Sequence, residues 1–112
     1  MMDDTFEAKY WETWYKREAI GSGAGSRGEA LDYKASVLND IYVKFNTSNV
    51  FDFGCGDGFL VSKLNCKTYF GVDISNESVR LCKERVNKSN FHFEQGHFYE
   101  YTPEVIISKY KT

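Results

Sequence analysis

The chain has 112 residues with a net charge of −2, and 42% of its residues are apolar, which is ordinary for one globular domain. This length excludes a two-domain enzyme, and the lack of any Lys/Arg cluster gives no nucleic-acid signal. No apolar run approaches the roughly 18 residues of a membrane span, and the first residues are unlike a signal peptide. We therefore expect a cytoplasmic protein without a membrane partner.

The three cysteines carry no metal or disulfide signature. They stand at positions 55, 66 and 82, without a Cys-x-x-Cys pair or a zinc-like spacing to histidine. We expect no metal site, and free buried thiols in a reducing compartment.

The first 28 residues are predicted to form an N-terminal segment. Aromatic residues at helical spacing predict a helix over residues 3–19, and the Gly/Ser-rich run at 21–28 is typical of a linker or mobile loop. We assign residues 1–28 to an N-terminal helix and Gly-rich loop, and residues 29–112 to the main domain.

Short β-prone runs alternate with helical patterns in the main domain. The expected strands are 50–53, 68–73 and 91–94, and the expected helices are 29–46, 58–63 and 76–88. This alternation predicts βαβ units, and right-handed crossovers then give a parallel sheet of order 3-2-1. The predicted fold class is α/β, a Rossmann-like parallel sheet with flanking helices, incomplete at about three strands.

Residues 104–108 are the candidate for a fourth strand. To pair with strand one they would have to cross the sheet and return one strand length over the short link from Gln95 to Pro103. That link suffices only if nearly extended, at roughly 3.3 Å per residue. The geometry therefore favours a terminal helix or an extra arm.

The strongest functional signal is the run DFGCGDG at residues 52–58, between a predicted strand and a helix. A sharp turn with a ligand against its backbone requires glycine, and ligands of open α/β sheets lie at the carboxyl ends of the strands. Asp52 and Asp57 disfavour a phosphate there and favour a cationic or zwitterionic ligand, although Asp57 also suits a helix N-cap. Asp73, at the end of the next strand, can accept two ribose hydroxyls.

These motifs resemble those of the class I S-adenosylmethionine-dependent methyltransferase family. The likeness covers roughly residues 10–101, with residues 50–58 similar to the first motif and 69–75 similar to the second strand and its acidic end. The family sheet normally has seven strands, so the resemblance implies a truncated domain that holds the N-terminal, cofactor-binding half.

The resemblance implies S-adenosyl-L-methionine as cofactor and assigns roles to eight residues. Asp52 would orient the ammonium group, Asp73 would hold the ribose hydroxyls and Ile74 would pack on the adenine. The remaining implied contacts are Gly54, Cys55 and Gly56 for the methionyl part, and Gln95 or His97 for the adenine amino group. No catalytic base and no methyl acceptor are indicated.

Three alternatives stay open. A non-catalytic module or split-enzyme subunit could bind the cofactor or S-adenosylhomocysteine, a dinucleotide enzyme could use the same turn, and the turn could serve a fold with no ligand. In each case the run 50–53 would leave an apolar strand edge, at which we expect self-association or a partner chain.

Overall fold

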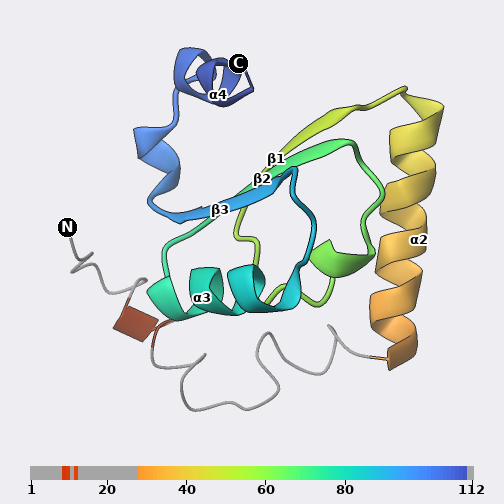
Figure 1. Ribbon diagram of the computed structural model, residues 1–112, viewed down its shortest axis with the longest axis horizontal. Helices are drawn as coiled ribbons and strands as arrows, with labels where there is room; N and C mark the ends of the chain where they lie inside the picture. The colour runs from red at the N-terminus through yellow and green to blue at the C-terminus, as the bar shows by residue number, and fades with distance from the viewer. Residues whose placement is uncertain (1–8, 11, 13–27, 111–112) are drawn as a thin grey trace.

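The computed structural model describes residues 9, 10, 12 and 28–110 (Figure 1). Residues 9, 10 and 12 are helical. The rest of the helix expected over 3–19, and the expected loop before Gly28, lie outside the described residues.

The centre of the fold is a three-stranded parallel sheet. Its strands are β1 (Asn49–Phe53), β2 (Thr68–Asp73) and β3 (Phe91–Gln95), in the order β1-β2-β3. The register places Phe51 opposite Phe70 and Phe70 opposite His92. The predicted fold class and strand order are confirmed.

Two helices lie on opposite faces of the sheet (Figure 1). Helix α3 (Asn76–Arg85) covers one face, and α4 (Pro103–Lys109) lies above the other. The Thr102 side chain accepts a hydrogen bond from the Val105 N–H, and Pro103 suits the first turn because its missing N–H would be unpaired there anyway. Residues 104–108 are therefore helical, so the terminal-helix expectation is confirmed and the fourth-strand candidate is wrong.

The main core lies between the sheet and α3. Tyr69 is fully buried on β2, and its ring stacks on that of Phe91 with centroids 5.2 Å apart. Val79 and Cys82, three residues apart on one face of α3, fill the other side of this layer. Along β3 the burial alternates, so that its phenylalanines face the core and His92 faces away.

The opposite face of the sheet is also aromatic. The rings of Phe51 and Phe70 are stacked at 5.5 Å, and Tyr101 lies 5.3 Å from Phe51 and 5.8 Å from Phe53. The two aromatic layers thus hold seven of the 19 aromatic residues of the chain.

Apolar residues recur at helical spacing along the expected helix 29–46, at positions 31, 35, 38, 42 and 45, with 37 and 41 widening the predicted stripe. Helix α2 (Gly28–Lys44) buries only part of this stripe. Leu31 and Ala35 are buried, whereas Phe45 is 68% exposed just beyond the helix end. The reason is position, because α2 stands beside the sheet and contacts the turn at 61–63 rather than crossing a sheet face (Figure 1). Other exposed members of the predicted stripe are Val37 and Ile41.

The helix expected over 58–63 is only a short 3-10 turn, η2 (Val61–Lys63). Gly58 has a left-handed φ of +91°, and the Asp57 side chain accepts the N–H of Phe59, so the chain turns before it can start a regular helix. Asp57 therefore ties a turn together instead of capping an α-helix. Helix α3 also ends at Arg85, three residues earlier than its predicted end at 88.

Within the residues described, no helix is long and apolar enough to cross a membrane.

Gly71, at the centre of β2, tests how tightly the layers pack. A Cβ there would lie 2.8 Å from both the Cys55 Cβ and the Tyr69 Cε1, so the neighbours would have to move. We predict that Gly71→Ala lowers the free energy of unfolding by about 2 kcal/mol through overpacking. Urea titration measures this, with Asn87→Ala on the exposed loop after α3 as the control. Equal stability of the two variants would contradict the packing described.

Candidate cofactor site

The turn after β1 depends on glycines in the left-handed region. Gly54, Gly56 and Gly58 have φ values of +86°, +74° and +91°, which side chains with a Cβ rarely adopt. The N–H groups of Gly54 and Cys55 both donate to the Val72 carbonyl, at 2.6 and 3.2 Å, and so hold the turn against β2.

The first and last of these glycines serve different purposes. A Cβ on Gly54 would meet no atom within 4 Å, so this backbone faces open space at the carboxyl end of β1. A Cβ on Gly58 would lie 3.0 Å from the Cys82 Cα, so Gly58 instead allows α3 to approach the turn closely. Gly54 is therefore suited to a ligand, and Gly58 to packing.

Asp73 ends β2 and joins the two predicted motifs. Its Oδ2 accepts the Gly56 N–H at 3.2 Å, and its Oδ1 accepts the Ser75 N–H at 3.1 Å. The residue is only 7% exposed, and burial raises the pKa of its carboxyl above the ordinary 3.8 despite these two hydrogen bonds. Each oxygen has further lone pairs, so the carboxylate can accept more hydrogen bonds.

Asp52 faces the core below the turn. Its Oδ2 accepts the Tyr69 hydroxyl at 2.5 Å, and burial raises the pKa of its carboxyl although this hydrogen bond opposes the shift. Cys55 is buried beside it, with its sulfur 3.7 Å from that of Cys82. The Asp52 carboxylate, which precedes the glycines, is thus held by the hydroxyl group of Tyr69.

The adenine-side candidates are brought to the same end of the sheet. The Gln95 Nε2 donates to the Ile74 carbonyl at 3.2 Å, and the Gly96 N–H donates to the Asp73 carbonyl at 3.0 Å. His97 instead begins the turn η3 (Phe98–Glu100), with its N–H donating to the Glu100 Oε1 at 2.7 Å and its ring stacked on Tyr99 at 4.7 Å.

Sequence reasoning missed two contributors to this site. The Ser78 hydroxyl donates to the Gly56 carbonyl, so α3 supports the turn directly. The Glu12 Oε1 accepts the Ser75 hydroxyl at 2.8 Å and the Glu77 N–H at 3.0 Å, although the partners lie 63 and 65 residues away. A helix-capping pattern reveals Ser75, but no local signal reveals a cap so distant in sequence.

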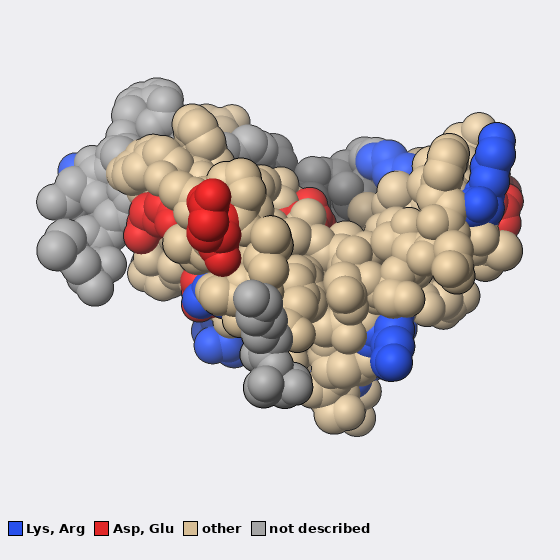
Figure 2. Space-filling model, turned by 90° about the horizontal axis from the view of Figure 1, so that it is seen from above, with Lys and Arg blue, Asp and Glu red and all other residues tan. Residues whose placement is uncertain are grey.

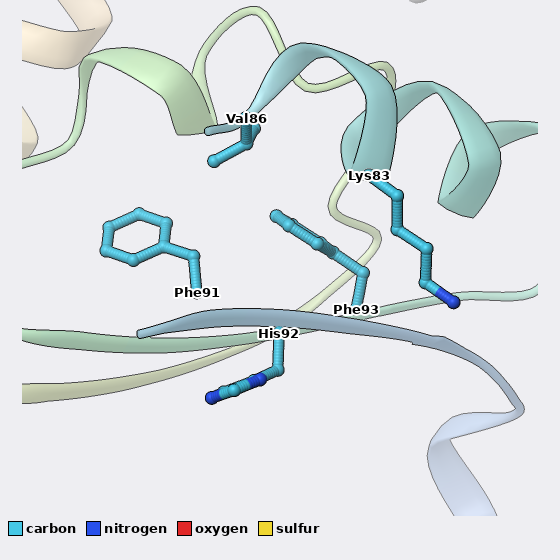
Figure 3. A pocket seen from close by; sticks show the side chains of 5 residues that line it. All are labelled: Lys83, Val86, Phe91, His92 and Phe93. Atoms are coloured by element: carbon cyan, nitrogen blue, oxygen red, sulfur yellow. The ribbon is translucent and has the colours of Figure 1, made fainter. Parts of the chain in front are cut away.

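A separate hollow of about 240 Å³ lies between α3 and β3 (Figure 3). Phe91 and Phe93 point toward α3, and His92 points to the other side of the strand (Figure 3). None of the candidate cofactor residues lines it. The lining residues are Lys83, Val86, Phe91, His92 and Phe93.

Charge does not mark an additional site on the face seen in Figure 2. Among the described residues visible there, acidic and basic side chains are scattered and most of the surface is uncharged (Figure 2). This distribution offers no basic patch for a polyanion on that face.

Residues 44–111 match a protein family described as a methyltransferase domain, which is more than half of the chain. The chain therefore belongs to this methyltransferase family, and the predicted family resemblance is confirmed. No curated protein matches the sequence.

Two solved structures resemble the chain. A SAM-dependent methyltransferase from Anabaena variabilis ATCC 29413 is 17% identical with a TM-score of 0.57, over 87% of this chain and 42% of its own. A second, from the complex between the Haloferax volcanii Trm112 methyltransferase activator and a methyltransferase, is 17% identical with a TM-score of 0.47, over 87% and 40%. The first likeness supports the fold. The chain spans about two fifths of the length of either structure.

The partly buried Asp52 and the buried Asp73 predict a pH dependence of stability. Burial raises the pKa of Asp52 and of Asp73 above 3.8, so the folded chain holds these protons more tightly than the unfolded chain. Their contribution to the free energy of unfolding is therefore largest in acid and falls as the pH rises from about 4 through the raised pKa values.

We predict that Asp52→Asn makes this fall shallower and raises stability at pH 7, because an amide oxygen can still accept the Tyr69 hydroxyl. Urea unfolding across the pH range measures the effect. Asp40→Asn, exposed on α2, controls for the loss of one negative charge. An Asp52→Asn profile parallel to that of the unmodified chain would refute the assignment.

Proposed function

We propose that the chain binds S-adenosyl-L-methionine and forms the cofactor-binding half of a methyltransferase. The observation that carries the proposal is the buried Asp73 carboxylate, fixed by the Gly56 N–H at 3.2 Å. This bond joins the glycine turn of β1 to the acidic end of β2, which is where nucleotide-type ligands lie in open α/β sheets.

The described residues fit that cofactor. Asp73 has two oxygens oriented by backbone N–H groups, with lone pairs left for two ribose hydroxyls. Gly54 faces open space where any Cβ would stand, so the methionyl part can approach the backbone there. Gly56 and Cys55 continue this surface, and Asp52 supplies negative charge for the ammonium group.

For the adenine we assign Ile74 to packing and Gln95 to the amino group. Because the Gln95 nitrogen donates to the Ile74 carbonyl, its amide oxygen is the end that can accept from an adenine amino group. His97 is the second candidate for this contact, although its N–H and ring already engage the η3 turn.

The bound cofactor would supply a methyl group activated by a sulfonium. The residues of this chain would bind and orient that group and exclude water from it. We assign no general base and no acceptor site among the described residues. The cytoplasm suits the chain, since all three cysteines are buried free thiols.

The alternative is a non-catalytic module, or one subunit of a split enzyme, that binds S-adenosylmethionine or S-adenosylhomocysteine. This alternative keeps the same cofactor contacts and differs only in whether methyl transfer follows.

Calorimetric titration of the chain tests cofactor binding. We expect S-adenosylmethionine and S-adenosylhomocysteine to bind and NAD not to bind. Asp73→Asn should weaken binding by about tenfold or more, since hydrogen bonds to a charged group contribute roughly 1.5–3 kcal/mol. Asp40→Asn should bind as the unmodified chain does. Absence of binding, or equal affinity of Asp73→Asn, would overturn the proposal.

A methyl-transfer assay with labelled cofactor and cell extract then separates the two forms of the proposal. Incorporation above that of the extract alone, and lower with Asp73→Asn at limiting cofactor, would support an enzyme. Binding without incorporation would support the non-catalytic module.

The outer edge of β1 supports a partner or a second copy. Ser48 and Gly54 direct their backbone groups to β2, so the alternation of a strand turns those of residues 49, 51 and 53 outward. Within the described residues no strand pairs with that edge. Phe53, the last residue of β1, has a side chain that is 45% exposed. An edge of this kind invites strand addition.

We predict that the chain associates through this edge. Sedimentation should show a dimer or a larger complex, and Phe53→Lys should shift it toward the monomer because charge on an edge strand opposes pairing. Phe45→Lys makes the same change beyond the end of α2, where the phenylalanine is 68% exposed, and should not shift it. A monomeric unmodified chain at high concentration would contradict the prediction.

A further inference from the structure

The Glu12 carboxylate lies at the start of α3, next to the candidate cofactor site. Figure 1 shows the described residues 9, 10 and 12, in red, beside the first turn of α3. The Glu12 Oε1 accepts the Ser75 hydroxyl at 2.8 Å and the Glu77 N–H at 3.0 Å. One oxygen therefore contacts both a side chain and the backbone of the helix start.

Together Glu12 and Ser75 form a shared cap. The Ser75 oxygen accepts the Ser78 N–H at 3.2 Å, while Glu12 accepts the Glu77 N–H, so two of the N–H groups left unpaired at a helix start are satisfied. A carboxylate is also favoured there by the positive end of the helix dipole. Because the Ser75 hydroxyl donates to Glu12 while it accepts from Ser78, the two hydrogen bonds reinforce each other.

This cap is directly connected to Asp73. The Ser75 N–H donates to the Asp73 Oδ1 at 3.1 Å, so the residue that Glu12 holds also orients the carboxylate. The Ser78 hydroxyl donates to the Gly56 carbonyl, and the Gly56 N–H returns to the Asp73 Oδ2. Glu12 thus stabilises one corner of a ring of hydrogen bonds around the end of β2.

Repulsion from neighbouring carboxylates works against a charged Glu12 at this position. Asp73 is buried close by, and Glu77 in the same helix turn carries a further carboxylate, paired with Arg80. The helix start offsets this accumulation of negative charge through its N–H groups and dipole. The arrangement is consistent with a carboxylate held for the two hydrogen bonds it accepts.

We propose that Glu12 is a positioning residue for the cofactor site, holding Ser75 so that Asp73 keeps the orientation that receives the ribose. The role rests on the proposed function, because it is defined by the affinity for S-adenosylmethionine and its product. Glu12 acts through Ser75 and Asp73, and not by contact with the reacting group.

The first arm of the test needs no cofactor. Amide hydrogen exchange of the ¹⁵N-labelled full chain, followed by NMR, reports the Glu77 N–H that Glu12 accepts. Glu12→Ala should speed this exchange by about fivefold, which is the factor for a typical lost cap of about 1 kcal/mol. Glu12→Gln should restore most of the protection, because its amide oxygen accepts both hydrogen bonds. Unchanged exchange in Glu12→Ala would overturn the cap.

The second arm measures S-adenosylhomocysteine affinity by calorimetry at a temperature where every variant is folded. Glu12→Ala should bind about fivefold more weakly, and Glu12→Gln should recover most of the loss. Glu77→Gln is the matched control, since it removes a carboxylate from the same helix turn but leaves the Glu77 N–H in place. A Glu12→Ala chain that melts earlier yet binds equally would overturn positioning and leave only a stabilising cap.

A double-mutant cycle tests whether Glu12 affects cofactor affinity through the Ser75 hydroxyl. Ser75→Gly removes the intermediary hydroxyl at a cap position that tolerates glycine, so the variant should fold. If Glu12 acts through Ser75, Glu12→Ala should add little to the affinity loss of Ser75→Gly, whereas additive losses would overturn this route. If the unmodified chain binds neither S-adenosylmethionine nor S-adenosylhomocysteine, both the proposed function and the positioning role of Glu12 are wrong. The hydrogen-exchange result still shows whether Glu12 caps α3.

Discussion

The hydrogen bonds to Asp73 are the interaction on which the site depends. This one carboxylate accepts the N–H of Gly56 from the turn after β1 and the N–H of Ser75 from the start of α3. It therefore fixes the end of one strand, the turn of its neighbour and the origin of a helix relative to one another. The left-handed glycines make the turn possible, and the Asp73 carboxylate joins the Val72 carbonyl in holding the turn against β2.

The strands and the glycine turn could be predicted because their signals are local. The alternation along residues 91–94 predicts a strand from four adjacent residues. The run DFGCGDG predicts a tight turn in the same local way. The exposed side of α2 could not be predicted, since Phe45 has the same helical spacing as Leu31, and only the position of α2 beside the sheet separates them. The contacts of Glu12 join residues more than sixty positions apart, and no pattern along the chain encodes such a pairing.

The site reduces the stability of the fold that contains it. Asp52 and Asp73 are both buried deeply enough to raise their carboxyl pKa values, so keeping them charged at neutral pH costs free energy. The Tyr69 hydroxyl and the backbone N–H groups offset part of this cost. Acidic groups retained under such conditions are typical of positions kept for binding rather than for folding.

The placement of Cys55 has a consequence for the chemical durability of the turn. Its thiol is only 6% exposed and lies against the sulfur of Cys82, and the contact with Cys82, together with burial, raises the Cys55 pKa. Peroxides and electrophiles attack the thiolate, which is scarce when the pKa is raised. A residue type that is easily oxidised therefore stands between two glycines of the turn, shielded from peroxides and electrophiles in the solvent for as long as the chain stays folded.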